Sequence, residues 1–414
     1  MAEGPAWWRG PFLRLWAGQT ISLAGSRITL VALPLSAILT LRAGPFQTGL
    51  LTAAETAPAL VIGLLAGVWV DRIRRRPLMI GMDLARAVLL FSIPVAAWLG
   101  VLSLGQLYVV AFGAAALTIV FSLAYTSYVP SLVPKSRLVD ANSRLELSSS
   151  LAQILGPALG GGLVQALTAP VAIGADALSF LGSAASLLAI RASEPSVDRA
   201  GRESLWHEAR SGLDLVARSP VLRSLAAASA TFNLFDNVLF GVYVLYMVRT
   251  LHLSTPAIGL VFGLGGAGGV LGALLVSPLT RLVGMGRGIM LGLILATAGE
   301  MLIAGASGPQ VVAVVILVAA EGSVELGATL YSINSLSLRQ AQTPPDLQGR
   351  VGAAMRLAEW VFGPAGALAG GVLGGAIGLR PTVLVAGVGT LLSLGWLVAS
   401  PVSRIREEAM TPAT

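Results

Sequence analysis

The sequence predicts an all-α membrane protein of twelve transmembrane helices, arranged as two pseudosymmetric bundles of six. Apolar residues make up 55% of the 414-residue chain and charged residues only 11%, a balance unlike that of water-soluble domains. Twelve apolar stretches are each long enough to cross a bilayer as a helix, and they lie near 14–40, 46–70, 77–99, 105–129, 145–167, 169–190, 222–250, 256–281, 286–306, 309–336, 350–378 and 381–402.

The basic residues support this fold and predict its orientation. With both termini in the cytoplasm, 22 of the 27 Lys and Arg residues lie on cytoplasmic segments, whereas the outer loops hold only Arg42, Arg249 and Arg380. This is the asymmetry of the positive-inside rule. We therefore expect a monomeric, multi-pass protein of the plasma membrane, in a bacterium the inner membrane. The net charge of +7 then indicates contact with anionic lipid headgroups, not with nucleic acid.

The twelve stretches fall into two groups of six. The first six fill residues 1–190, a polar stretch occupies 191–221, and the last six fill 222–414. Within the polar stretch Pro195 and Gly201 interrupt the chain, and the apolar residues that follow recur at helical spacing. This pattern predicts a cytoplasmic linker with an amphipathic helix on the inner membrane surface.

The two groups also resemble each other in sequence. The segment LRLWAGQTISLAGSR from Leu13 matches LRSLAAASATFNLFD from Leu222 at an offset of 209 residues. GPALGGGL from Gly156 recurs as GPAGALAGG from Gly363. Parallel repeats of six spans are typical of transporters whose binding site lies between the halves at the middle of the membrane.

The loop after the second stretch carries the sharpest motif, GLLAGVWVDRIRRRP at residues 63–77. It is similar to the G-x-x-x-D-R-x-x-R-R signature of the major facilitator superfamily, and the matching positions are Gly67, Asp71, Arg72, Arg75 and Arg76. Over nearly its whole length the chain resembles the proton-driven drug exporter branch, which includes macrolide efflux and enterobactin export proteins. The resemblance implies a multidrug efflux transporter linked to antibiotic resistance, not an enzyme. Such a transporter exchanges small amphipathic compounds for protons by alternating access.

The charges of this motif suggest a gate. Asp71 ends the second stretch, where the negative end of its own helix disfavours a carboxylate. The eleventh stretch begins on the same side, so its positive end and Arg350 can receive Asp71 when the inner side is closed. The alternative is that the arginines serve only as positive-inside anchors.

The fifth stretch carries a second motif, with Gly156, Pro157, Gly160 and Gly161. It resembles the antiporter motif G-P-x-x-G-G of exporters in this superfamily. Small residues allow helices to approach closely, and proline permits a bend at the interface. Ordinary small-residue packing is the alternative.

Carboxyl groups outnumber bases inside the predicted spans. Eight acids face only Arg27 and Arg86, and charges inside a bilayer are costly, so some carboxyl groups must be protonated, paired or open to water. Buried carboxyl groups are natural proton carriers. Glu321 and Glu325 share one helix face and would repel each other if both were charged, so we expect at least one of them to take up a proton. This face is a candidate for proton coupling. Glu55 and Glu359 are further candidates.

Three other acids have simpler interpretations. Asp83 lies three residues before Arg86, which predicts a structural ion pair. Asp176 and Glu300 lie close to the ends of their spans, where we expect them to reach water. Related exporters often carry an acid after a glycine in the first span, but here Gly25 is followed by Ser26.

The repeat suggests a partner for Arg27. At an offset of 209 it falls on Asp236 in the seventh span, so we expect the two charges to pair across a central cavity. Arg27 with Glu55 or Glu359 is the alternative pairing.

The driving force and the substrate follow from the same composition. The chain has no phosphate-binding loop and its two histidines form no ligand cluster, so we expect no cofactor or metal, and the proton gradient as energy source. The acid excess and apolar lining favour a lipophilic, neutral or cationic small molecule. Other hypotheses are an exporter of one native metabolite, siderophore or lipid, and a transport-inactive sensor or scaffold. The aromatic candidates for contact with substrate, for which packing is the alternative, are Tyr125, Phe232, Phe235 and Tyr331.

Overall fold

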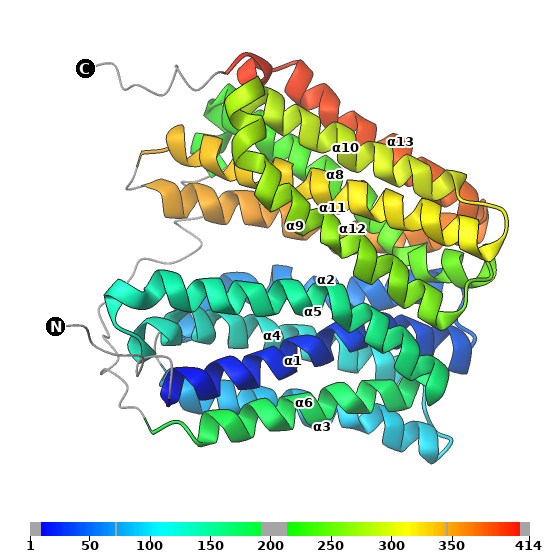
Figure 1. Ribbon diagram of the computed structural model, residues 1–414. Coiled ribbons are helices and arrows are strands. Elements are labelled where there is room, and N and C mark those ends of the chain that lie inside the picture. Colours follow the sequence, from blue (N-terminus) through cyan, green and yellow to red (C-terminus); the bar gives the residue numbers. More distant parts are fainter. Residues whose placement is uncertain (1–9, 71–72, 192–212, 345–346, 406–414) are drawn as a thin grey trace. The chain divides into compact units, whose positions relative to one another are not determined.

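The computed structural model describes residues 10–70, 73–191, 213–344 and 347–405, and these residues form helices and loops without a β-strand (Figure 1). The first half contains α1 (Pro11–Leu35), a π-helical turn (Ser36–Thr40), α2 (Pro45–Val70), α3 (Arg75–Trp98), α4 (Leu104–Leu132), α5 (Leu138–Ala166) and α6 (Ala169–Leu188). The second half contains α8 (Pro220–Arg249), α9 (Thr255–Val283), α10 (Met285–Gly305), α11 (Gln310–Ala341), α12 (Gln348–Ala376) and α13 (Leu379–Val398).

Eleven helical segments of the described chain are long and apolar enough to cross a membrane. The helix α2 has 26 residues but is not among the eleven, so the count of twelve spans stays a prediction. The expected linker helix falls mostly on residues 192–212, which lie outside the described residues; residues 213–218 are helical.

The chain folds into two compact units. The N-terminal unit comprises 1–43, 54–202 and 255–259, and the C-terminal unit comprises 44–53, 203–254 and 260–414. Each unit thus includes the first residues of one helix whose remainder belongs to the other, α9 in the first case and α2 in the second.

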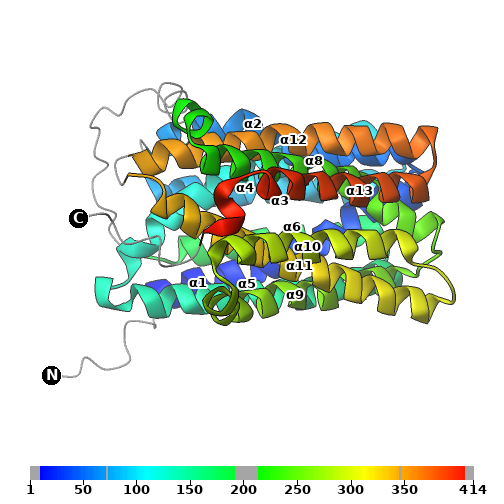
Figure 2. The same cartoon turned by 90° about the horizontal axis from the view of Figure 1, so that it is seen from above.

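Both units use the same set of helix pairs. In the N-terminal unit α1 packs on α5 and α6, and α3 packs on α4 and α6 (Figure 1). In the C-terminal unit α8 packs on α12 and α13, and α10 packs on α11 and α13 (Figure 2). The pairings correspond one to one, with α1, α3, α4, α5 and α6 matching α8, α10, α11, α12 and α13. Such correspondence is typical of parallel repeats.

Glycines at equivalent positions create the closest helix contacts in both units. A Cβ on Gly160 of α5 would lie 3.1 Å from the Ile28 backbone of α1, and one on Gly370 of α12 would lie 2.2 Å from the Val238 carbonyl oxygen of α8. Gly161 lies against the start of α9 in the same way that Gly371 lies against the start of α2. A side chain at these positions would push the helices apart, so the small residues permit the packing.

These contacts correct the offset of the repeat. Residues 28 and 238, like 160 and 370, are 210 positions apart. Gly156 abuts the Arg27 side chain, and the equivalent Gly366 abuts Asn237. The structural counterpart of Arg27 is therefore Asn237, not Asp236, and the offset of 209 is one residue short at this place. Asp236 instead corresponds to Ser26.

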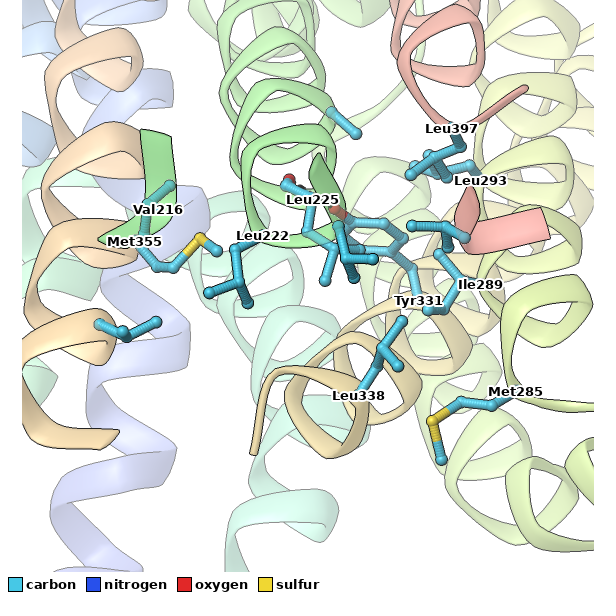
Figure 3. Packing of buried hydrophobic residues seen from close by; sticks show 14 of the residues in the cluster. Val216, Leu222, Leu225, Met285, Ile289, Leu293, Tyr331, Leu338, Met355 and Leu397 are labelled. Carbon is cyan, nitrogen blue, oxygen red and sulfur yellow. Dashed lines mark hydrogen bonds between the residues drawn. The ribbon is translucent and has the colours of Figure 1, made fainter. Parts of the chain in front are cut away.

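One apolar cluster fills the C-terminal unit at the ends of α8, α10, α11, α12 and α13 (Figure 3). Tyr331 of α11 lies inside it, beside Leu225 and Leu293, and is only 8% exposed. Its hydroxyl oxygen lies 2.8 Å from the Ser229 hydroxyl and donates to the Leu225 carbonyl at 3.3 Å. Burial of the ring and satisfaction of the hydroxyl account for its position without a ligand.

Arginine side chains bind the carbonyl groups at the end of α6. Arg76 of α3 donates to the carbonyl oxygens of Leu187 and Leu188 at 2.9 and 2.8 Å, and Arg14 of α1 donates to that of Ala189. Helix carbonyls at this end have no partner within the helix, and cations stabilise its partial negative charge. The two arginines thereby join α1, α3 and α6 at one end of the unit.

Candidate functional site

The gate motif lies partly outside the described residues. Asp71 and Arg72 are not described, and Gly67 belongs to α2. Arg75 and Arg76 begin α3, where Arg76 makes the contacts with α6 given above. Arg350 is the third residue of α12. The contact of Asp71 with Arg350 therefore stays a prediction.

The antiporter motif lies at a tightly packed interface in the N-terminal unit. Gly156, Pro157, Gly160 and Gly161 are all buried in α5. Gly156 and Gly160 face α1, and Gly161 lies against the first residues of α9, where a Cβ would come within 2.3 Å of the Thr255 carbonyl oxygen. The motif thus sets how closely α5 approaches both helices.

A buried charge network occupies the middle of the N-terminal unit. Asp83 and Arg86 of α3 form the ion pair that their spacing predicts, and their side chains are 0% and 4% exposed. The guanidinium of Arg86 lies over the rings of Phe121 and Phe180, 4.5 and 4.1 Å from their centroids. These two cation–π contacts compensate part of the lost hydration of this cation.

Asp176 belongs to the same network. It is 1% exposed, so the expectation that its carboxylate reaches water is wrong. Its two oxygens accept hydrogen bonds from Thr29 of α1 at 2.5 Å and from Ser179 at 3.0 Å, and Arg86 acts on it electrostatically. The carboxylate can remain in the interior because hydroxyl groups and a cation replace its water.

The C-terminal unit contains a cluster of four carboxyl groups, Asp236 of α8, Glu300 of α10, and Glu321 and Glu325 of α11. We call this set the acid cluster. Asp236 interacts with Glu325, Glu321 interacts with Glu325 and Asp236, and Glu300 interacts with Asp236 and Glu321. In the described chain, the charged groups that act on Asp236, Glu300 and Glu321 are thus acids of the cluster itself.

The members of the acid cluster differ in exposure. Asp236, Glu321 and Glu325 are partly exposed, whereas Glu300 is fully buried. The expectation that Glu300 reaches water is therefore also wrong. Gly265 of α9 faces Glu321, where a Cβ would come within 2.5 Å of the glutamate side chain. Part of the glycine run in α9 thus gives the α11 glutamates room.

Glu359 and Glu55 are separate from the acid cluster. Glu359 of α12 is partly exposed and lies in the field of two bases, Arg339 and Arg356. Its negative charge is therefore compensated by nearby bases. Glu55 of α2 is partly exposed, and no charged group of the described residues is a cause of the change in its electrostatic environment, which comes from loss of contact with water. Arg27, also partly exposed, makes no ion pair with a described residue of its own unit.

The aromatic candidates are engaged in packing. Tyr125 of α4 stacks on Phe121, with ring centroids 6.2 Å apart. The ring of Phe235 occupies the space over Gly389 of α13, and Phe232 packs against the apolar cluster around Tyr331. Tyr125, Phe232 and Phe235 keep partial exposure, so contact with substrate stays a prediction for these three.

The sequence matches the Major Facilitator Superfamily over residues 15–365. The chain belongs to that superfamily. The match covers most of the chain, including the signature around Asp71, the glycine motif of α5 and the acid cluster. The chain is therefore a membrane transporter and not an enzyme, and its fold is that of the superfamily.

Known members of the superfamily resemble the chain over most of its length. It is 30% identical to the multidrug efflux pump Tap of Mycolicibacterium fortuitum, over 96% of this chain and 97% of the pump. It is also 30% identical to the uncharacterized MFS-type transporter y4rN of Sinorhizobium fredii, over 83% of each chain. Multidrug efflux relatives agree with the drug exporter branch indicated by the sequence, and bacterial relatives agree with a bacterial inner membrane.

Solved superfamily structures support the fold. A bacterial homologue of the human lysosomal transporter Spinster, in an inward-facing and unoccupied conformation, has a TM-score of 0.74 at 14% identity. The comparison covers 99% of this chain and 100% of the homologue. At this identity the likeness concerns the fold alone.

Sequence reasoning missed several members of the two buried networks. The sequence did not indicate Thr29 and Ser179, or Tyr243 of α8, whose buried hydroxyl interacts with Glu321 of the acid cluster, and it placed Glu300 near water. One signal was available for Tyr243, because it follows Asp236 by seven residues and therefore shares its helix face. The contact of Thr29 with Asp176 joins helices 147 positions apart, which no local pattern reveals.

Proposed function

We propose that the protein exports small lipophilic compounds across the plasma membrane by alternating access, in exchange for protons. Similarity to a multidrug efflux pump over almost the whole chain supports export of several compounds. The acid cluster supports proton coupling, because partly exposed carboxyl groups that repel one another bind protons readily. Both termini lie in the cytoplasm in this proposal, and the protein acts as a monomer.

The observation that carries the proposal is the absence of a base acting on the described carboxyl groups of Asp236, Glu300 and Glu321. Ionisation of the whole cluster in a membrane interior would place several like charges together at a high cost. Protons are the smallest available counter-charge. A lipophilic cation entering the partly exposed side of the cluster would compete with those protons, which is how exchange arises.

The test uses purified protein in liposomes with an imposed pH gradient and a panel of lipophilic dyes and antibiotics. We expect export that follows the gradient and stops when an ionophore collapses it. Neutralising Glu321 and Glu325 together with Gln should abolish gradient-driven export while substrate binding stays measurable. If the double variant still follows the gradient, Glu55 and Glu359 become the next candidates. If the wild-type protein ignores the gradient, proton exchange is excluded.

The gate is tested separately at Asp71. We expect Asp71→Asn to weaken closure of the inner side, to slow turnover, and to increase labelling of single cysteines introduced at the inner ends of the helices. The chain has no native cysteine, so the labelling is specific. Arg74→Gln serves as the control, because Arg74 is outside the signature positions. Unchanged labelling together with wild-type export by Asp71→Asn would contradict the gate.

A further inference from the structure

Glu300 is an anomaly among the buried charged groups. It is 0% exposed, and neither carboxylate oxygen has a hydrogen-bond partner among the described residues. Buried polar groups are nearly always hydrogen-bonded, and an isolated buried charge is far more costly than an unpaired neutral group. The state of Glu300 therefore requires an explanation.

The charged groups around Glu300 disfavour its charged form. Asp236 of α8 and Glu321 of α11 are the charged groups that act on it, and both are acids. The side of α13 offers Thr390, a neutral hydroxyl. Arg380, also on α13, uses its guanidinium on the Ala306 carbonyl oxygen, beyond the end of α10. A neutral, protonated carboxyl group satisfies this environment, and a carboxylate does not.

Thr390 of α13 carries a hydroxyl that can accept the acid proton, although no hydrogen bond between it and Glu300 is formed in this structure. The hydroxyl of Thr390 donates its own hydrogen to the Gly387 carbonyl at 2.9 Å, which leaves its oxygen lone pairs able to accept. The buried hydroxyl of Tyr243 also has no hydrogen-bond partner among the described residues. It lies close enough to Glu321 to interact with it electrostatically. The acid cluster thus contains two buried polar groups without a hydrogen-bond partner among the described residues, the Glu300 carboxyl group and the Tyr243 hydroxyl.

We propose that Glu300 is a proton-binding residue, which holds a proton in the interior of the C-terminal unit and exchanges it through Asp236 and Glu321. In the exchange the O–H bond of the Glu300 carboxylic acid breaks, and the proton passes to a carboxylate oxygen of Glu321 or Asp236, directly or through water. The partly exposed acids then release it to water. Within the proposed proton-coupled export, on which its role in transport rests, Glu300 is the innermost proton site.

The test measures protonation directly by infrared spectroscopy of purified protein in detergent at neutral pH. A protonated carboxyl group has its own C=O band, distinct from that of a carboxylate. We expect Glu300→Gln to remove one such band and Glu300→Asp to retain it. The matched control is Glu359→Gln, another intramembrane glutamate of the same unit, which should leave the band unchanged because two arginines act on Glu359. An unaltered band in Glu300→Gln would overturn the proposal.

A second variant covers the case in which Glu300→Gln does not fold. Thr390→Val keeps the shape of the side chain and removes the proposed acceptor, so the band should shift to higher frequency. An unshifted band would overturn the proposal as well. Because the spectra need no gradient, they report on Glu300 even if export proves independent of protons. In liposomes, Glu300→Gln should lose gradient-driven export while retaining dye binding.

Discussion

The two units share one scaffold but differ in their buried charges. In the N-terminal unit Arg86 lies over two phenylalanine rings and serves Asp83 and Asp176, and hydroxyl groups complete the hydrogen bonds of Asp176. In the C-terminal unit the described groups that act on Asp236 and Glu300 are other acids. A network with its own base can stay charged and hold helices together, whereas acids that act on one another favour bound protons. The first network therefore serves the packing of its unit, and the second is the one that the proposed proton exchange uses.

The repeat makes this difference sharper. Asp236 stands where the N-terminal unit has Ser26, the position at which related exporters often carry an acid in the first span. The carboxylate that is missing from one half of the chain is thus present at the equivalent place in the other. Within the proposed proton exchange, Asp236 takes the place of that missing carboxylate.

The largest expected effect concerns Arg86. Replacing it with Met leaves Asp83 buried without its cation, which should lower the free energy of unfolding by about 3–5 kcal/mol. Thermal unfolding of the purified protein measures the loss, and the double variant with Asp83→Leu should recover much of it. The control is Arg137→Met, since Arg137 and Asp140 have the same spacing but are about half exposed, and such pairs contribute little. Equal losses in both single variants would remove the distinction.

An intermediate effect is expected at the glycine contacts. Gly370→Ala places a Cβ 2.2 Å from a backbone oxygen, which should cost about 1–3 kcal/mol of unfolding free energy. Gly160→Ala should cost less, because its nearest contacts are at 3.1 Å. Gly162 and Gly375 serve as controls, since a Cβ there meets nothing within 4 Å. If thermal unfolding shows a larger loss of stability for Gly160→Ala than for Gly370→Ala, the two contacts are not packed as described.

The smallest effect is expected at Glu359. Because Arg339 and Arg356 compensate its charge, Glu359→Gln should leave the response of export to the pH gradient within about twofold of the wild type. The comparison is with Glu321→Gln in the same liposome assay. A complete loss of the gradient response in Glu359→Gln would move proton binding out of the acid cluster.

Hydropathy and charge patterns predicted the fold, because long apolar helices and short basic loops are local features of the sequence. The pair Asp83 and Arg86 was predictable for the same reason, since one helix turn joins them. Burial of Asp176 and Glu300 was not, because the distance of a residue from the end of its helix says nothing about the helices around it. The one-residue error in the repeat arose because weak similarity in the first and seventh spans allows either register, whereas the glycine contacts allow only one.

The arginines at the end of α6 have a mechanical consequence. In rigid-body rocking, each bundle turns without changing its shape, so its helices have to move together. Arg14 and Arg76 tie α1 and α3 to the last carbonyls of α6. At this end the three helices form a stiff corner, and bending there would break several charge-assisted hydrogen bonds at once. Under the proposed alternating access, we expect α1, α3 and α6 to move together as one rigid group.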